Sequence, residues 1–302
     1  MTVSIITAFY NVENYIEESF NSIINQMVDI DIEYILVNDS STDNSYDIVN
    51  KLILTNKNPN IRIKLLSTPE NLGCGGARKY GIDHSTGDYL MFLDADDTYI
   101  NNDFVNRAVN DIIENDADIV EYGVRYINLF KSGPYNHGSK EKIIIENDIE
   151  KAEILLFKDN LIKFHVWSKI IKKDIANSYP YSVERTFEDV DTIPVWVSIA
   201  KKIVIMPSIE INYNKIDNSI IRTDPLITRI GTINSIAKLF PRFKNNRNIL
   251  KAMYIRSLMD FKSVLLNHTS DDPGFNELSK YNTYMLSFLY PNNFMDFTYN
   301  IN

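Results

Sequence analysis

The sequence has 302 residues, of which 44% are hydrophobic and 24% charged, as in ordinary globular proteins. Its net charge of −9 argues against a nucleic-acid binder, because such proteins present a basic surface. Every apolar run is shorter than the roughly 18–20 residues of a membrane span, and the N-terminal "MTVSIITAFYN" is typical of a strand rather than an export signal. The single cysteine, Cys74, excludes an intramolecular disulfide and fits a reducing compartment, so we expect a cytoplasmic protein.

The first part of the chain alternates short β-rich runs with helical patterns, which indicates βαβ units and a mostly parallel sheet. "VSIITAFY" at 3–10 is a buried-strand pattern, and the apolar spacing after it predicts a helix over 13–27. Further strands are predicted at 33–39, 61–67, 88–96 and 117–127. The helices between them are predicted at 43–57, 74–85 and 101–115. The expected fold class is therefore α/β.

The rest of the chain becomes progressively helical. Residues 129–145 are turn-rich and predict a hairpin or an ordered loop. Helices at 148–158 and 186–201 and a strand at 202–214 follow. After Pro225 the sequence predicts three more helices, at 226–239, 246–266 and 276–289. We expect a boundary near 222–226, with one domain over 1–222 and a helical region over 223–302.

A basic segment lies in this helical region. Residues 238–262 contain one acid, Asp260, and seven bases: Lys238, Arg242, Lys244, Arg247, Lys251, Arg256 and Lys262. Apolar residues at 250, 254, 258, 261 and 265 are expected to form one helical stripe, with lysines and arginine on another face. Such a helix can rest on anionic lipid or bind a phosphorylated acceptor. Packing on its own domain, or contact with a second copy in a homo-oligomer, is the alternative.

Acidic and polar residues follow three predicted strands where each strand ends: "TAFYN", Asp39 and "LMFLDADDTY". In parallel α/β sheets ligands bind at these carboxyl ends, so three converging loops predict a nucleotide site. Because side chains alternate along a strand, we expect Asp94 and Asp96 on the same side, able to hold Mg²⁺ or Mn²⁺. The alternative is an acidic turn in which Asp97 or Asn101 caps the next helix.

The stretch "NLGCGGARKYG" at 71–81 is rich in glycine and opens a helix. It lacks the glycine spacing of a dinucleotide-binding fingerprint and follows the third strand rather than the first. We interpret it as a tight turn that leads into a helix. Arg78 and Lys79 then lie near the helix start, to meet phosphate or to hold Asp39 or Asp94. A plain surface role for Arg78 is the alternative.

Taken in order, several stretches resemble the inverting family-2 glycosyltransferases, which have a GT-A fold with a Rossmann-like, mostly parallel sheet. The resemblance covers about residues 1–222. It rests on "VSIITAFYNVENYIEESFNSIINQ", "EYILVNDSSTDNS", "NLGCGGARKYGI", "GDYLMFLDADD", "WSKIIKKDI" and "ERTFEDVDT". Each motif alone is common, but the ordered set is specific.

The resemblance implies a binding site for a nucleotide-sugar. Asp39 matches the acid that hydrogen-bonds uracil, which favours a UDP-sugar donor, and Arg78 matches the arginine of an "ARN" stretch. The residues that it places along the nucleoside are Ala8, Tyr10 and Asn11. Asp94 and Asp96, with Ala95 between them, match a D-x-D pair that binds sugar hydroxyls and Mn²⁺ or Mg²⁺. In the tail segment Lys215 or Arg222 is expected to replace the usual arginine.

The "FEDVD" run resembles the motif that supplies the general base. A carboxylate must take the proton of the acceptor hydroxyl as the new bond forms. We expect Asp189 to be this base and Glu188 to support it or contact the acceptor; first-turn acids that complement a helix dipole are the alternative. Trp167 and Lys169 match the acceptor side of the site, although Trp167 can equally be a core aromatic.

These observations predict an inverting, metal-dependent transferase that moves a sugar from a UDP-sugar to a hydroxyl-bearing glycan, lipid-linked or polymer acceptor, as in cell-surface polysaccharide, teichoic acid or other glycoconjugate synthesis. A nucleotidyltransferase is one alternative, but it would need a glycine-rich basic loop after the first strand, where this chain has "TAFYNVEN". A sugar-nucleotide-binding module without activity is the other. The segment 238–262 leaves open a peripheral contact at the inner face of the membrane.

Overall fold

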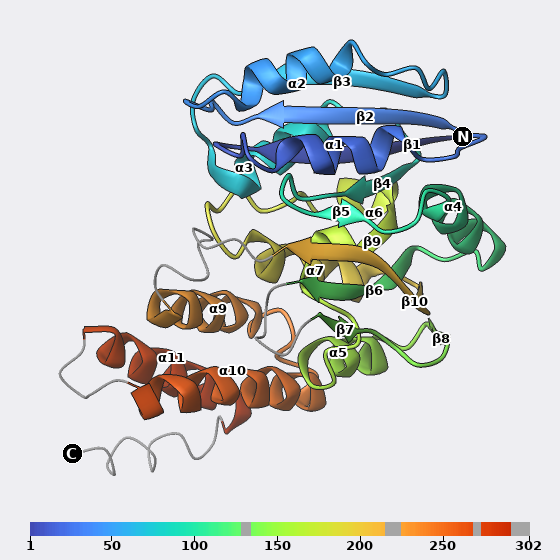
Figure 1. Ribbon diagram of the computed structural model, residues 1–302. Coiled ribbons are helices and arrows are strands. Elements are labelled where there is room, and N and C mark those ends of the chain that lie inside the picture. The colour runs from blue at the N-terminus through green and yellow to red at the C-terminus, as the bar shows by residue number, and fades with distance from the viewer. Residues whose placement is uncertain (128–133, 215–224, 268–272, 291–302) are drawn as a thin grey trace. The chain divides into compact units, whose positions relative to one another are not determined.

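The computed structural model describes residues 1–127, 134–214, 225–267 and 273–290 (Figure 1). The chain divides into two compact units. The first comprises Met1–Ile149 and Leu161–Ile216, and the second comprises Glu150–Asn160 and Asp217–Asn302. Residues 150–160, which our boundary assigned to the first domain, thus belong to the second unit.

The first unit contains one sheet with the strand order β3-β2-β1-β4-β9-β6-β10-β5. Four strands pair in parallel at one end: β1 (Thr2–Phe9), β2 (Asp31–Asn38), β3 (Ile61–Ser67) and β4 (Tyr89–Phe92). β6 (Ile119–Ile127) and β10 (Lys202–Asn214) are also parallel. The antiparallel β9 (Lys169–Lys172) joins the two groups. The predicted α/β class with a mostly parallel sheet is confirmed, whereas β9 was not predicted.

Three short strands extend this sheet by antiparallel pairing. β5 (Thr98–Tyr99) and β8 (Ile143–Glu146) pair with β10, and β7 (Tyr135–His137) pairs with β6. The antiparallel pairing of β7 with β6, the strand just before it, agrees with the hairpin predicted for the turn-rich region at 129–145, whereas β8, which begins in the same region, pairs with β10 instead. A short 3-10 helix, η1 (Val166–Ser168), directly precedes β9.

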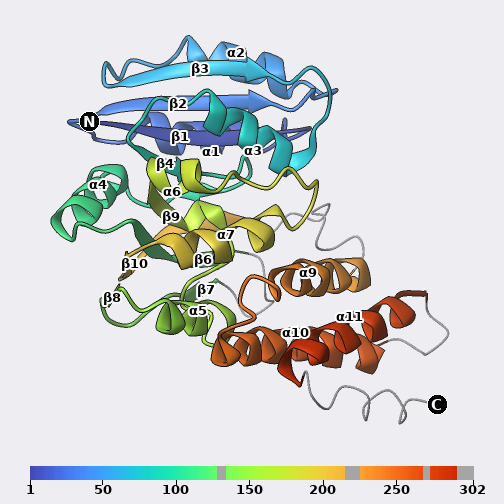
Figure 2. The same cartoon turned by 180° about the vertical axis from the view of Figure 1, so that it is seen from behind.

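Helices cover both faces of the sheet. α1 (Ile16–Ile24) and α2 (Ser45–Ile53) lie on one face (Figure 1), and α3 (Gly73–Asp83), α6 (Lys173–Ser178) and α7 (Glu188–Ile199) lie on the other (Figure 2). α4 (Phe104–Glu114) packs against β6 and β9. Because both faces are covered, β2 is buried at every position after Asp31, which explains its continuous apolar run.

The second unit is helical. It contains most of α5 (Ile149–Phe157) together with α9 (Pro225–Leu239), α10 (Arg247–Asn267) and α11 (Pro273–Leu289). α9, α10 and α11 pack against one another, as their predicted ranges anticipated. The side chains of Phe240, Met253 and Met285 are fully buried. Among the residues described, no helix is both long and apolar enough to cross a membrane.

Candidate active site

The parallel register brings three loops to one edge of the sheet. Phe9 at the end of β1 is opposite Asn38 at the end of β2, and Ile6 is opposite Phe92 at the end of β4. The backbone of Leu93 continues this register, because its N–H donates to the Ile6 carbonyl at 3.1 Å. The segments that follow β1, β2 and β4 therefore leave the sheet side by side, as the sequence predicted.

The acidic run "DADD" forms a turn rather than the end of a strand. β4 stops at Phe92, four residues before its predicted end, and the N–H of Asp97 donates to the Asp94 carbonyl at 3.0 Å. We call residues 93–97 the acidic turn. Strand alternation is therefore the wrong reason for bringing Asp94 and Asp96 together. The turn brings three carboxylates together, since ligand atoms of Asp94, Asp96 and Asp97 lie within 4.8 Å of one another.

Asp97 is the residue of this turn that sequence reasoning undervalued. Its side chain is completely buried, and Oδ1 accepts the N–H of Asn214 at 2.8 Å at the end of β10. Oδ2 has no hydrogen-bond partner within the described protein. Asp103, not Asp97, occupies the N-cap position of α4, so Asp97 does not cap that helix. The signal was present in the sequence as the third carboxylate of "DADD".

The acidic turn is electrostatically uncompensated on its own. Burial, and then the charge of Asp94, raise the pKa of Asp96 to about 7. Burial and the charges of both neighbours also raise the pKa of Asp97. A buried oxygen without a partner beside two further carboxylates fits a hard divalent cation such as Mg²⁺ or Mn²⁺, which takes oxygen ligands.

Arg78 connects the acidic turn to α7. Its guanidinium, only 4% exposed, forms ion pairs with Asp94 and Glu188. It also donates to the Tyr181 hydroxyl at 3.3 Å. Of the roles considered from the sequence, the structure therefore has Arg78 holding Asp94 and excludes the plain surface role. Lys79 points elsewhere and pairs with Asp83 at 2.6 Å.

The glycines of α3 explain how Arg78 reaches Glu188. A Cβ on Gly75 would lie 2.3 Å from the Glu184 carbonyl and 2.6 Å from the Ser182 carbonyl. Only glycine allows α3 to pack this closely against the segment before α7. The glycine-rich stretch thus allows α3 to pack closely, and it places the buried guanidinium of Arg78 between the carboxylates of Asp94 and Glu188.

The first turn of α7 holds Glu188 and Asp189. Phe187, just before it, has a left-handed φ of 63°, which turns the chain into the helix. Burial, and then the charge of Glu188, raise the pKa of Asp189, while Arg78 opposes this shift. A carboxylate with a raised pKa is a better proton acceptor near neutral pH. The helix-dipole interpretation remains compatible, because both acids lie at the N-terminus of α7.

The loops after β1 and β2 are joined by side chains on the predicted nucleoside side. Asn11, with φ of 53°, accepts the N–H of Thr42 at 2.8 Å. The Asp39 carboxylate accepts the backbone N–H groups of Leu72 and Gly73, each at 2.8 Å, and so holds the start of α3. Tyr10 is exposed and Ala8 is half-buried, whereas Ala95 is buried in the acidic turn.

The predicted acceptor-side residues are both buried. Lys169 Nζ is paired with Glu121 at 2.7 Å and donates to the carbonyls of Lys163 and His165, each at 2.6 Å, so it fixes the turn before β9. Trp167 stacks on His165 and on Tyr213, with ring centroids 4.6 and 5.6 Å apart. A role in acceptor binding therefore stays a prediction for Trp167 and Lys169.

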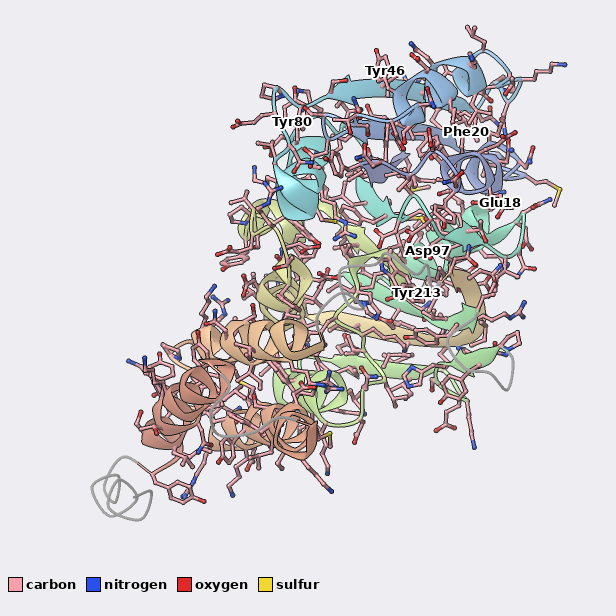
Figure 3. The ribbon with its side chains drawn as sticks, turned by 60° about the vertical axis from the view of Figure 1, so that its left-hand side comes forward. Glu18, Phe20, Tyr46, Tyr80, Asp97 and Tyr213 are labelled. Carbon is pink, nitrogen blue, oxygen red and sulfur yellow. The ribbon has the colours of Figure 1, made fainter. Side chains whose placement is uncertain are left out.

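Tyr213 links this aromatic group to the acidic turn. Burial, and then the charges of Asp97, Asp96 and Asp94, raise the pKa of Tyr213. Figure 3 shows Tyr213 and Asp97 close together. Asn214, the next residue, donates its side-chain amide to the Asp96 carbonyl at 2.8 Å. The predicted tail residues Lys215 and Arg222 lie outside the described residues.

Comparison with known proteins shows the family of the chain. The profile of glycosyl transferase family 2 matches residues 4–179. Glycosyltransferase GlyG of Streptococcus pneumoniae is 24% identical over 89% of this chain and 91% of its own length. The minor teichoic acid biosynthesis protein GgaB of Bacillus subtilis is 31% identical over 70% of this chain but only 22% of its own length. An uncharacterized glycosyltransferase of Haemophilus influenzae is 41% identical over 37% of this chain and 43% of its own length.

Two solved structures share the fold at low sequence identity. TarS 1-349 of S. aureus in complex with UDP-GlcNAc superimposes with a TM-score of 0.61 at 16% identity, over 95% of this chain and 91% of that one. The mannosyltransferase PcManGT of Pyrobaculum calidifontis in complex with GDP-Man and Mn²⁺ gives 0.59 at 16% identity, over 96% and 86%. The family match covers more than half of the chain, and the fold agrees with it. The chain therefore belongs to glycosyl transferase family 2 and is a glycosyltransferase with a GT-A fold.

Proposed function

We propose that the chain is an inverting, metal-dependent glycosyltransferase that moves a sugar from a UDP-sugar to a hydroxyl group of a glycan, lipid-linked or polymer acceptor. The observation that carries the proposal is the continuous contact from the acidic turn through Arg78 to the first turn of α7. TarS with UDP-GlcNAc supports a UDP-sugar donor, and PcManGT with Mn²⁺ supports a divalent cation. GgaB, a teichoic acid biosynthesis protein, supports an acceptor from cell-surface polymer synthesis.

The proposed residues divide between the two ends of this contact. Asp94, Asp96 and Asp97 would hold Mn²⁺ or Mg²⁺, which neutralises the charge that develops on a departing diphosphate. At the nucleoside side, we assign the contacts to the uracil and ribose to the loops after β1 and β2, with Asp39 on the base. Arg78 orients both ends, because its one guanidinium binds Asp94 and Glu188 together.

The proposed reaction is a single displacement. The acceptor oxygen forms a bond to the anomeric carbon while the bond from that carbon to the diphosphate oxygen breaks, and the electron pair leaves with UDP. The hydroxyl proton passes to the Asp189 carboxylate. Glu188 forms an ion pair with Arg78, and its charge keeps the pKa of Asp189 raised. Attack from the face opposite the diphosphate inverts the anomeric configuration.

The donor is tested first by binding. Thermal unfolding is measured with Mn²⁺ and each of UDP-glucose, UDP-GlcNAc, UDP-galactose and GDP-mannose. We expect a UDP-sugar to raise the unfolding temperature most, and to lose this effect when Mn²⁺ is replaced by EDTA. A larger shift with GDP-mannose would contradict the assignment of uracil to Asp39.

The base is tested by UDP release from that donor in the presence of hydroxyl acceptors. Asp189→Asn should reduce turnover by about 10²- to 10⁴-fold and leave UDP affinity unchanged in calorimetry. Asp191→Asn, which changes another acid of the same helical turn, is the matched control and should retain turnover. Unchanged turnover in Asp189→Asn would exclude it as the base. Release of pyrophosphate instead of UDP would indicate a nucleotidyltransferase, and donor binding without any turnover would indicate a binding module.

A further inference from the structure

Helix α10 has one exposed face that combines basic and large apolar side chains. Between Arg247 and Lys262, each exposed position other than Asn248 lies three or four residues from another along the chain, so they form a single row on the helix. Three of them are apolar, Ile255, Leu258 and Met259, with exposed fractions of 42%, 42% and 54%. We define the α10 row as Arg247, Lys251, Ile255, Leu258, Met259 and Lys262.

This arrangement differs from the one expected from the sequence. Leu250 and Phe261 of the predicted apolar stripe are buried, as expected, but Leu258 is exposed. The predicted apolar stripe is therefore wrong in part, because residues at 250, 254, 258 and 261 do not all lie on the buried side of α10. The exposed apolar residues therefore lie among the lysines instead of opposite them.

The α10 row carries positive charge without a carboxylate of its own. Lys251 and Lys262 are exposed on either side of the three apolar residues. The single acid of the segment, Asp260, is 9% exposed and pairs with Arg229 at 2.8 Å. At the N-terminal end of the helix, Asn248 donates a hydrogen bond to Glu150 at 2.7 Å.

We propose that the α10 row docks the second unit on a bilayer surface that contains anionic phospholipid. A helix lying in the interface places apolar side chains at the boundary with the acyl chains and cationic side chains among the headgroup phosphates. Ile255, Leu258 and Met259 are the side chains that enter, and Lys251 and Lys262 bind phosphate. Because the whole chain has a net charge of −9, anionic lipid repels most of it, and an attractive contact has to be confined to such a basic face.

Other occupants of this face fit the observations less well. A two-fold contact with a second copy would set the same basic row against itself, so lysines would face lysines. A soluble phosphate polymer would bind the lysines but gain nothing from the three apolar residues between them. An anionic bilayer, in contrast, offers partners for both kinds of side chain.

Co-sedimentation of the full chain with vesicles tests the proposal. Vesicles of phosphatidylcholine alone are compared with vesicles in which phosphatidylglycerol replaces part of the lipid. We expect binding to the anionic vesicles only. The charge variant Lys251→Gln with Lys262→Gln should weaken it roughly tenfold or more. The apolar variant Ile255→Ser, Leu258→Ser and Met259→Ser should also weaken it about tenfold or more.

A matched control removes the same charge elsewhere. Lys51→Gln with Lys57→Gln changes two exposed lysines of the first unit and should bind vesicles like the unchanged protein. Circular dichroism checks that each variant is folded. The vesicle test needs no donor sugar, so its outcome is independent of the proposed function.

Three results would overturn the inference. The first is equal binding by the control and the charge variant. The second is an apolar variant that binds anionic vesicles as well as the unchanged protein, with soluble polyphosphate competing fully, which would indicate a polyphosphate site. The third is a dimer in sedimentation velocity that becomes a monomer only in the apolar variant, while that variant still binds vesicles like the unchanged protein. This result would indicate that the face serves self-association.

Discussion

Replacing Arg78 tests the central contact of the site. In Arg78→Met a chain of similar length without charge fills the same buried space. Glu188 then loses its ion pair although its side chain is only 6% exposed, and Asp94 loses its tether to α3. We therefore expect lower stability and loss of turnover from one substitution.

The magnitude follows from burial. Removing one partner of a buried ion pair leaves an uncompensated charge and costs about 3–5 kcal/mol. The lost pair with Asp94 adds little to this cost, because the Asp94 side chain is 28% exposed and water can solvate its charge. Adding Glu188→Gln removes the orphaned charge, so the double variant should regain about 2–3 kcal/mol of the loss. Glu188→Gln alone leaves Arg78 with Asp94 and should be less harmful than Arg78→Met.

Urea unfolding at neutral pH, followed by circular dichroism, measures these differences. Lys79→Met is the matched control, because the neighbouring Lys79 forms an ion pair with Asp83 in which the side chains are 28% and 51% exposed. Such a pair contributes less than about 1 kcal/mol. If the double variant is no more stable than Arg78→Met, the reasoning fails, because the cost would then come from lost packing and not from a stranded charge.

Three further changes probe the acidic turn, the α3 packing and the sheet. Burial and Asp94 raise the pKa of Asp96 from 3.8 to about 7, so its ionisation lowers stability as pH rises between these values. In EDTA at about pH 8, Asp96→Asn should therefore unfold at a higher urea concentration, with a free energy of unfolding larger by up to about 4 kcal/mol. It should, however, lose the stabilisation by Mn²⁺ that we expect of the unchanged protein. Gly75→Ala should lower both stability and UDP release, because its Cβ would meet the Glu184 carbonyl at 2.3 Å. Burial raises the pKa of Glu33, but hydrogen bonds led by that from Lys64 outweigh it and lower the pKa from 4.5 to about 2. The lowered pKa of Glu33 stabilises the fold by at most about 3 kcal/mol above pH 4.5, and this contribution is lost as pH falls towards 2. In Glu33→Gln the free energy of unfolding should therefore depend less on pH in this range.

The parallel half of the sheet could be predicted because its signals are local. β1 and β2 are runs of mostly buried residues, each followed by a helix with its own apolar spacing, and β3, at the edge of the sheet, is a β-rich run whose residues are mostly half-buried. β9 could not be predicted in the same way. Its four residues, Lys169–Lys172, are too short for a pattern, and their place between β4 and β6 is decided by strands more than 40 residues earlier in the chain.

Part of the site could also be predicted from the sequence, because some of its signals are local. The acids of "DADD" and "FEDVD" stand out in the sequence, and strand order predicts that the loops after β1, β2 and β4 meet. Two facts depend on tertiary packing instead. The ion pair between Arg78 and Glu188 joins residues 110 positions apart, and the burial of Asp97 depends on the end of β10. No local pattern reports either contact.

These long-range contacts give the site its coupling. Asp94 is at once a member of the acidic turn and a partner of Arg78, which in turn fixes Glu188 beside the proposed base. A cation bound at the turn would compete with Arg78 for the charge of Asp94 and so strengthen the hold of Arg78 on Glu188. Occupation of the turn would then alter the electrostatic surroundings of Asp189, whose pKa depends on both Glu188 and Arg78. Donor binding and proton transfer would thus be coupled through one buried side chain.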